Sequence, residues 1–401
     1  MSRHCPPLRA SVKFCALDRR FAERQKHIMV PDHHSPQRIT RLASLTDVTA
    51  WIGANVRAVA RADTDSARAI GHVLAKDIAA SHAMPRKTIS LRDGYALQSD
   101  WTSDASSYAP APLPQNPVRV DAGDELPSGM DCVAALEHIA INGKRAEALA
   151  VVAPGDGVLP AGGDAGTNQP LLRAGQKLRA SDMAILRVAA ITSVSIRAPR
   201  ISVVRAGRAD DPIIASAAGM MAAAIVADGG VVLDDHNTLE AAMQHKDVDA
   251  VIAIGGTGAG KNDSSVTTLS RAGSVAFHGI GLNPGETAAI GVAGGKPVLL
   301  IPGRIDAALS CWLVLGRHIL AQLSGAVADD VTSPLKLARK ITSTIGIADV
   351  VLLKQRGGEA EPLASGFWPM QAMTQADHYV VVPPDSEGFP AGAIVNVRPL
   401  P

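Results

Sequence analysis

The chain contains few aromatic residues and few cysteines. Phe, Trp and Tyr together make up 3% of its 401 residues, so Ala, Val, Ile and Leu have to fill its cores. Such cores suit parallel α/β layers better than an aromatic-rich β-sandwich. The cysteines are widely separated and include no C-x-x-C pair; they are Cys5, Cys15, Cys132 and Cys311. This spacing argues against a disulfide framework or a structural zinc site and favours a reducing compartment, the cytoplasm.

The chain also lacks an excess of one charge and a long apolar run. Its 39 basic and 38 acidic residues give a net charge of +1, whereas a protein that binds nucleic acid normally carries a basic excess. No apolar run reaches the roughly 18 residues of a membrane span. We therefore expect neither a nucleic acid nor a membrane as partner. Residues 1–38 are basic and irregular, and we expect a tail outside the fold, with Met29 as an alternative start.

The remaining residues change character several times, which predicts a multidomain chain of the α/β plus β class. Apolar residues recur at helical spacing over 39–61, and we expect further helices at 66–75 and 181–190. The expected parts are helical or connecting segments at 39–84 and 164–198, a small β-rich domain at 85–163, an α/β domain at 199–327 and a C-terminal β-domain at 333–401.

Within 199–327, short apolar strands alternate with helical segments. The expected strands are 201–204, 231–233, 251–254, 275–277 and 298–301, and the expected helices are 212–227, 238–245, 264–272 and 305–323. Alternation with nearly all-apolar strands predicts a parallel sheet covered on both faces. Ligands of such sheets bind at the carboxyl ends of the strands, where the glycine-rich loops of this chain fall.

The most informative loop follows the strand at 251–254 and runs to Asp263. Its glycines are Gly255, Gly256, Gly258 and Gly260. Bare backbone amides after a buried strand are suited to holding an anion. The loop nearly fits the nucleotide-binding pattern G-x-x-x-x-G-K-[ST], but Asn262 stands where that pattern places a magnesium-binding hydroxyl. A purely structural alternative is a tight turn with Asp263 as the helix N-cap. A second loop, Pro302–Gly303, should lie beside the first and favours a ligand site.

Several stretches, in order, resemble the molybdopterin molybdenumtransferases (MoeA and the gephyrin E-domain). Gly255 to Asp263 matches their Gly-Gly-x-x-x-Gly-x-x-Asp signature. The other matching stretches are Asp93-Gly94-Tyr95-Ala96, Gly123 to Glu137, Gly163-Asp164 with Ala174-Gly175-x-x-Leu178, Asn283-Pro284-Gly285-Glu286 and Ile301-Pro302-Gly303. The resemblance covers roughly Ile39 to Pro401 and implies a molybdopterin-binding α/β domain flanked by β-rich domains, in a homodimer.

The resemblance implies molybdenum cofactor biosynthesis. Members insert molybdate into adenylylated molybdopterin and release AMP with a divalent metal, here expected to be Mg²⁺. Molybdoenzymes or other cofactor-synthesis proteins are possible partners. The implied catalytic residues are Asp93, Asp164 and Asp263, and the implied metal ligands are Asp235 and Asp263. The implied cofactor-binding residues are Gly255, Gly256, Thr257, Gly258, Gly260, Asn283, Pro284, Gly285, Pro302 and Gly303.

The departures from the family pattern leave two functions open. Asn283 and Glu286 replace both lysines of the family's Lys-Pro-Gly-Lys segment, and an anion thus stands where a cation would face the substrate. Four cations near the loops could restore positive charge or could face solvent, namely Arg205, Arg208, Lys261 and Arg304. The chain is therefore expected to be either an active molybdenumtransferase or a catalytically impaired molybdopterin-binding carrier or scaffold.

Overall fold

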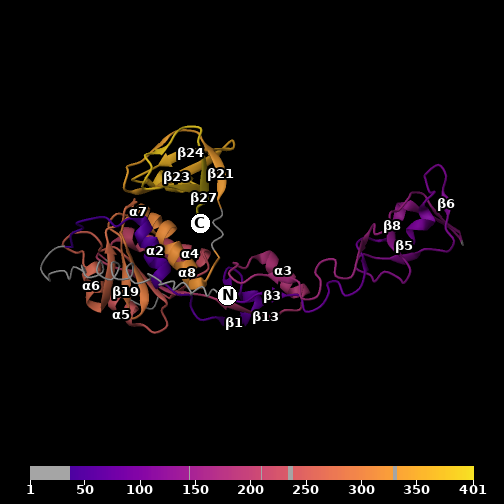
Figure 1. Cartoon of the computed structure of the whole chain (residues 1–401), viewed down its shortest axis with the longest axis horizontal. Coiled ribbons are helices and arrows are strands. Elements are labelled where there is room, and N and C mark those ends of the chain that lie inside the picture. Colours follow the sequence, from indigo (N-terminus) through magenta and orange to yellow (C-terminus); the bar gives the residue numbers. More distant parts are fainter. Residues whose placement is uncertain (1–36, 144, 209, 234–237, 328–331) are drawn as a thin grey trace, which may run out of the picture. The chain divides into compact units, whose positions relative to one another are not determined.

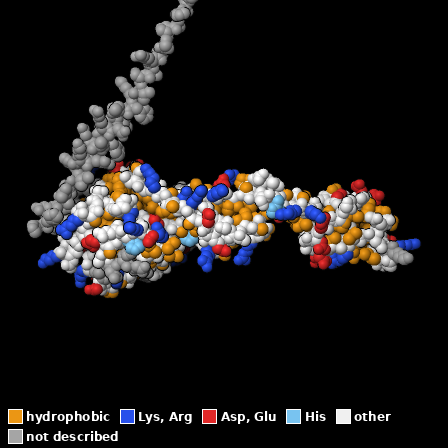
Figure 2. All heavy atoms as spheres, turned by 90° about the horizontal axis from the view of Figure 1, so that it is seen from below, with side chains coloured by type: hydrophobic (Ala, Val, Ile, Leu, Met, Phe, Trp, Pro, Cys, Tyr) orange, Lys and Arg blue, Asp and Glu red, His pale blue; other side chains and the backbone are white. Residues whose placement is uncertain are grey.

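The computed structural model describes residues 37–401 except 144, 209, 234–237 and 328–331. The described residues form two compact units, one made of residues 37–60 with Ala198–Pro401 and the other of Arg61–Arg197. Figure 1 shows the elements of each unit. Among the described residues, no helix is long and apolar enough to cross a membrane. On the face shown in Figure 2, basic and acidic side chains lie interspersed.

The first unit is built on a six-stranded sheet in the order β15-β14-β16-β20-β19-β17. Its strands are β14 (Arg200–Arg205), β15 (Val231–Leu233), β16 (Ala250–Ile254), β17 (Gly273–His278), β19 (Ala289–Ala293) and β20 (Lys296–Ile301). Strands β15, β14, β16 and β20 are parallel, as predicted. Strand β19 was not predicted and runs antiparallel to both of its neighbours. It includes Gly291, where a Cβ would lie 2.0 Å from Ser274 O, so close strand approach excludes a side chain.

Helices cover both faces of this sheet, as predicted. They are α4 (Pro212–Ala227), α5 (Leu239–Gln244), α6 (Ser265–Ala272), α7 (Ile305–Cys311) and α8 (Arg317–Ser324), with a π-helical turn at Trp312–Gly316. Alternate strand residues face opposite layers, because side chains alternate along a strand. Ile252 and Ile254 pack in the core that contains α4, α7 and α8, whereas Val251 and Ala253 pack against α5 and α6. Figure 1 shows these two layers.

The N-terminal helix of this unit is shorter than predicted. Helix α2 spans Leu45–Asn55, whereas helical spacing suggested 39–61. Ser44 caps its start by accepting a hydrogen bond from Asp47 N at 3.0 Å, which fixes the first turn. Val48 and Ile52 are fully buried in the core beside α8. Residues before the helix lie along the sheet edge instead, where Ala43 forms a bridge with Ile280.

A second sheet of the first unit has the order β18-β23-β24-β21-β27-β25, and β25 also pairs with β23. Its strands are β18 (Leu282–Asn283), β21 (Ser333–Leu337), β23 (Ala348–Arg356), β24 (Glu359–Ala364), β25 (His378–Val382) and β27 (Ile394–Pro399). A two-stranded antiparallel sheet, β22 (Ile341–Thr342) with β26 (Gly388–Phe389), and helix α9 (Met370–Gln375) complete this part. Strand β18 comes from the α/β region, so it joins the two sheets.

The second unit consists mostly of short antiparallel strands. They are β1 (Ala62–Asp65), β2 (Val73–Leu74), β3 (Ile78–Ala79), β4 (Ile89–Ser90), β5 (Gly94–Leu97), β6 (Ala111–Pro112), β7 (Val118–Val120), β8 (Cys132–Ala135), β9 (Ile139–Asn142), β10 (Arg145–Ala148), β11 (Val158–Leu159), β12 (Pro170–Leu172) and β13 (Ser193–Arg197). Helix α3 spans Ala180–Val188, close to the predicted 181–190. The helix predicted at 66–75 is wrong: a single 3₁₀ turn, Ser66–Arg68, precedes β2, which pairs with β13.

Candidate functional site

Three loops meet at the carboxyl edge of the first sheet, because β14, β16 and β20 are neighbours there. Gly255 N donates to Ile301 O at 2.8 Å, which ties the start of the glycine loop to the end of β20. A Cβ built on Gly303 would lie 3.6 Å from Gly255 Cα, and one built on Gly207 would lie 2.9 Å from Gly256 N. The two predicted loops therefore do lie side by side, and the loop after β14 joins them.

The first two glycines of the loop occupy conformations that exclude other residues. Gly255 has φ +97° and Gly256 has φ +71°, in the left-handed region that glycine adopts at no steric cost. A Cβ on Gly255 would lie 2.6 Å from Ala206 O, and one on Gly256 would lie 2.3 Å from Ser265 Oγ. Backbone conformation and close packing therefore both require glycine at these positions.

Carbonyl oxygens of the glycine loop accept hydrogen bonds from the protein itself. The donors are Ser265 Oγ to Gly255 O (2.8 Å), Ser265 N to Gly256 O (3.1 Å), Gln37 Nε2 to Gly256 O and Gly258 O (3.0 Å each), and His278 Nε2 paired with Thr257 O (3.0 Å). In addition, the hydroxyls of Thr257 and Thr287 lie 2.9 Å apart. The carbonyls of residues 255–258 are thus all used within the fold.

The donor side of the loop is different. Within the described part of the chain, the amides of residues 256–259 have no hydrogen-bond partner. Gly255 N and Gly260 N, which flank them, are bound to Ile301 O and to Asp263 Oδ2. Consecutive unpaired amides form a concavity that suits an anion. The local geometry therefore supplies backbone donors without a protein acceptor to satisfy them.

Asp263 closes the loop rather than capping the helix that follows. Its Oδ2 accepts from Gly260 N at 2.8 Å, and its own amide donates to Gly260 O at 3.1 Å. The N-cap residue of α6 is Ser264, whose side chain makes no capping bond. The alternative that Asp263 serves as the N-cap is therefore wrong. Its half-buried carboxylate lies within the glycine loop.

The four candidate cations divide into two kinds. Arg205, Arg208 and Lys261 are exposed and, among the described residues, have no acidic partner. Arg304 is paired with Asp306, a residue with only 3% exposure. The hydrogen bonds that Arg304 donates to Asp306 are the main cause that raises the pKa of Arg304, and the nearby Glu286 charge adds to it. Arg304 is thus neutralised by its neighbours, whereas the other three cations keep their charge available.

The segment Asn283–Glu286 is anchored to the second sheet through Asn283. Asn283 lies on β18 and donates its Nδ2 to Asp349 Oδ1 on β23 at 2.6 Å. The other oxygen of Asp349, which is 5% exposed, accepts from Ser343. Glu286 accepts from Gly285 N at 3.2 Å. The side chains that replace the family's lysines are therefore used in contacts within the protein.

The predicted carboxylates of the second unit are not brought together. Asp93 is exposed and accepts from Ala122 N at 2.8 Å, and Asp164 is exposed with its amide bound to Met84 O. Among the described residues, no hydrogen bond or ion pair joins the two carboxylates.

The predicted metal site is only partly described. Asp235 lies outside the described residues, and Asp263 is therefore the described member of the predicted pair. No group of three or more His, Cys, Asp or Glu side chains suited to a metal occurs in the described ranges. Asp263 Oδ2 is bound to Gly260 N, which leaves Oδ1 as the oxygen open to a ligand.

Three residues that support the loop were not identified from the sequence. Ser265 could have been found, because it follows Asp263 by two positions and begins α6. His278 lies at the end of β17 and Gln37 lies in the stretch assigned to the tail, so neither carries a local signal. The prediction that the tail outside the fold extends to residue 38 is wrong at Gln37, which is 8% exposed and bonded to the loop.

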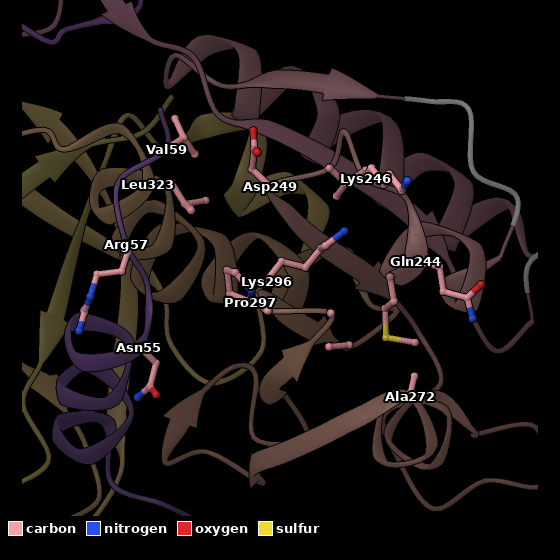
Figure 3. Close-up of a pocket in the computed structure, with 15 residues that line it drawn as sticks. Asn55, Arg57, Val59, Gln244, Lys246, Asp249, Ala272, Lys296, Pro297 and Leu323 are labelled. Carbon is pink, nitrogen blue, oxygen red and sulfur yellow. The ribbon is translucent and has the colours of Figure 1, made fainter. Parts of the chain in front are cut away.

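A cavity of the first unit lies at the opposite, amino-terminal edge of the sheet. It has a volume of about 640 Å³ and includes Asp249, before β16, and Lys296, at the start of β20. Figure 3 shows Lys296 reaching across it. Both side chains are already used, since Lys296 Nζ donates to His245 O and Asp249 pairs with Arg200. Burial lowers the pKa of Lys296. The two charged groups that the sheet strands place at this cavity are therefore already paired within the protein.

Two protein families match this chain. Residues 40–190 match the MoeA N-terminal region (domain I and II), and residues 209–322 match the family described as "Probable molybdopterin binding domain". The second match includes the whole glycine loop. The two matches together span both units of the chain.

Individual proteins similar to this chain carry names of the same family, at low sequence identity. A candidate molybdopterin biosynthesis protein of Methanocaldococcus jannaschii is 24% identical over 371 residues, which cover 84% of this chain and 91% of that protein. The molybdopterin molybdenumtransferase of Bacillus subtilis is 23% identical over 375 residues, covering 81% and 86%. The crystal structure of a molybdopterin biosynthesis MoeA protein from Pyrococcus horikoshii has a TM-score of 0.70 at 21% identity, covering 89% and 99%, and it supports the fold.

Proposed function

The chain belongs to the MoeA family, and its part in molybdenum cofactor biosynthesis follows from that membership; we propose that it inserts molybdate into adenylylated molybdopterin with release of AMP. The observation that carries the proposal is the glycine loop, in which the carbonyls of residues 255–258 are bound within the protein while the amides of residues 256–259 have no described partner. A phosphate group of the substrate supplies the acceptors that these amides lack.

Charge near the loop supports the same assignment. Arg205 ends β14, Arg208 follows the Gly207 that touches Gly256, and Lys261 lies within the loop itself. Because these cations have no described acidic partner, their charge is available to the substrate. In this proposal they supply the positive charge that the family's two lysines would supply. They attract an anionic substrate and offset the phosphate charge that builds up when AMP leaves.

Asp263 is the residue proposed to hold a divalent metal. A magnesium ion normally uses one or two carboxylates together with substrate phosphates and water, and Oδ1 of Asp263 fits that pattern beside the free amides. When bound, the ion would neutralise phosphate charge. The bond from Gly260 N fixes the orientation of the carboxylate. Asp93 and Asp164 remain predicted catalytic carboxylates.

A second function is favoured by one observation. Asn283 and Glu286, which replace the lysines, are used in contacts with Asp349 and Gly285 and contribute no cation to the site. A chain with this arrangement could bind molybdopterin and deliver it without inserting metal, as a carrier or scaffold for a molybdoenzyme or another cofactor-synthesis protein.

One assay separates the two functions. Purified protein is mixed with adenylylated molybdopterin, molybdate and Mg²⁺, and AMP is measured by chromatography together with activation of a cofactor-free molybdoenzyme. The proposal expects both AMP and activation. Tight pterin binding by calorimetry without AMP supports the carrier, and absence of binding contradicts both functions. A homodimer, which the family resemblance implied, is tested in the same preparation by light scattering.

A further inference from the structure

We propose that Gln37 is a positioning residue of the anion-binding loop, which holds the loop so that its amides are free for the substrate. This inference rests on the proposed function of the same loop. Gln37 belongs to the stretch just before the folded domain and is separated from the loop by 219 residues in sequence. Only 8% of its surface is exposed, although glutamine is usually a surface residue.

The Gln37 side chain uses its donors and its acceptor on one short stretch. Its Nε2 donates to Gly256 O and Gly258 O at 3.0 Å each, and its Oε1 accepts from Thr267 N at 3.0 Å. Thr267 lies in the first turn of α6, where amide groups lack partners within the helix. Since the Ser264 side chain makes no capping bond, Gln37 provides from a distance the acceptor that a local cap would supply.

These bonds determine which backbone groups of the loop stay free to bind a ligand. A peptide group whose carbonyl is bound on one side presents its amide on the other, because the C=O and N–H bonds of a trans peptide group point in opposite directions. Gln37 binds the carbonyls of Gly256 and Gly258, so it orients the peptide groups that carry the amides of residues 257 and 259. Both of these amides belong to the set without a described partner.

The chemistry of the bonds explains why an amide side chain is needed. Glutamate has the same length but would face two carbonyl oxygens with a negative charge, next to a site for an anion. Methionine has a similar length and makes none of the three bonds. Asparagine keeps the amide but is one methylene shorter. These three substitutions therefore separate charge, hydrogen bonding and reach at one position.

The test compares Gln37→Met, Gln37→Glu and the wild-type chain in binding of adenylylated molybdopterin by calorimetry. Loss of two loop hydrogen bonds should weaken binding by about 10–100-fold. Gln371→Glu is the matched control, since it makes the same change at an exposed position of α9 and should bind like wild type. Far-ultraviolet circular dichroism and a urea titration check that the variants are folded.

The pH dependence of binding distinguishes positioning from loss of stability. Carbonyl dipoles disfavour a charged carboxylate, so the carboxyl group introduced by Gln37→Glu should have a raised pKa. Below neutral pH its protonated form can donate to one carbonyl, and the affinity of Gln37→Glu should recover relative to wild type, whereas Gln37→Met should not recover.

The outcomes are separable. If wild type binds and both variants bind within about twofold of it, Gln37 is not a positioning residue, while the proposed function stands. If both variants bind weakly but Gln37→Glu shows no recovery relative to Gln37→Met at low pH, the hydrogen-bonding account is contradicted. If wild type does not bind, the proposed function fails and this inference fails with it.

Discussion

The glycine loop and the Asn283–Glu286 segment lie next to each other, yet the fold uses them in opposite ways. Thr257 and Thr287 connect them through hydroxyls 2.9 Å apart. In the glycine loop the carbonyls of residues 255–258 accept hydrogen bonds from the protein, and the amides of residues 256–259 have no described partner. In the other segment the side chains are bound, Asn283 to Asp349 and Glu286 beside Arg304.

The difference bears on the proposed site, because backbone amides and charged side chains respond differently to substitution. Backbone amides depend on φ values and packing, which a surface substitution does not alter. Side-chain cations depend on single residues, and this chain carries them at Arg205, Arg208 and Lys261 instead of 283 and 286. The account therefore predicts that the loop backbone dominates substrate binding and that position 283 contributes mainly to the contact between sheets.

The largest effect is expected from Gly255→Ala. The methyl group would lie 2.6 Å from Ala206 O, which overpacks the loop, and the φ of +97° would strain the alanine backbone. Both effects destabilise the folded state. We expect the free energy of unfolding to fall by about 2–4 kcal/mol and pterin binding to be lost. Gly346→Ala is the matched control, because its φ of +95° is nearly the same and nothing lies within 4 Å. Urea titration and calorimetry should show a loss of only about 1–2 kcal/mol there, with binding unchanged.

Asp263→Asn should separate binding from chemistry. The amide oxygen can still accept from Gly260 N, so the loop keeps its shape and pterin affinity should stay close to wild type. Removal of the charge should lower the rate of AMP release by on the order of a hundredfold, as for other groups that stabilise developing charge. Asp263→Ala loses the hydrogen bond too and should weaken binding as well. Equal AMP rates in wild type and Asp263→Asn would exclude a catalytic role for this carboxylate.

Intermediate effects are expected for the cations. Arg205→Gln, Arg208→Gln and Lys261→Gln should each weaken binding by roughly three- to tenfold at low ionic strength, and less at high salt, where exposed charges are screened. Arg304→Gln should leave affinity nearly unchanged, because Arg304 is already paired with Asp306. It should instead reduce stability, since the 3% exposed Asp306 loses its partner. If Arg304→Gln weakens binding most, the division into paired and available cations is wrong.

The smallest effect on binding is expected from restoring the lysines. In Asn283→Lys the new ammonium group would lie near Asp349, and in Glu286→Lys it would lie near Arg304. We expect affinity for adenylylated molybdopterin to change by less than about threefold in the double variant. A rise of tenfold or more, roughly 1.4 kcal/mol, would mean that this segment still faces the substrate.

The sequence predicted the parallel core of the α/β sheet and the meeting of its loops because these depend on local patterns. Val251–Ile254 is apolar on both faces, and the glycines follow it directly. Strand β19 was missed, since a glycine in a short Ala-rich stretch is a weak strand signal and its antiparallel pairing is set by close contact with β17. The predicted helix at 66–75 was wrong because tertiary pairing overrode local spacing. Val73 and Leu74, which fit a helical spacing, form β2 and pair with β13.

The candidate site could be predicted only where a motif marks it. The loop glycines and Asp263 lie together, within one stretch of sequence. The bond partners of the loop come from far away, Gln37 from 219 residues upstream of Gly256 and His278 from 21 residues beyond Thr257, and such contacts leave no periodicity. The hydrogen bond from Asn283 to Asp349 was not predicted either, because the family motif suggested that residue 283 contacts the ligand.

Hydrogen exchange of the loop amides tests the central claim most directly. Mass spectrometry of a peptide that covers residues 255–263 is compared with and without adenylylated molybdopterin, and a peptide from 289–293 serves as the internal reference. The account predicts strong slowing of exchange at residues 256–259 on binding, with no change in β19. Binding in calorimetry without protection of these amides would contradict the assignment of the glycine loop as the anion site.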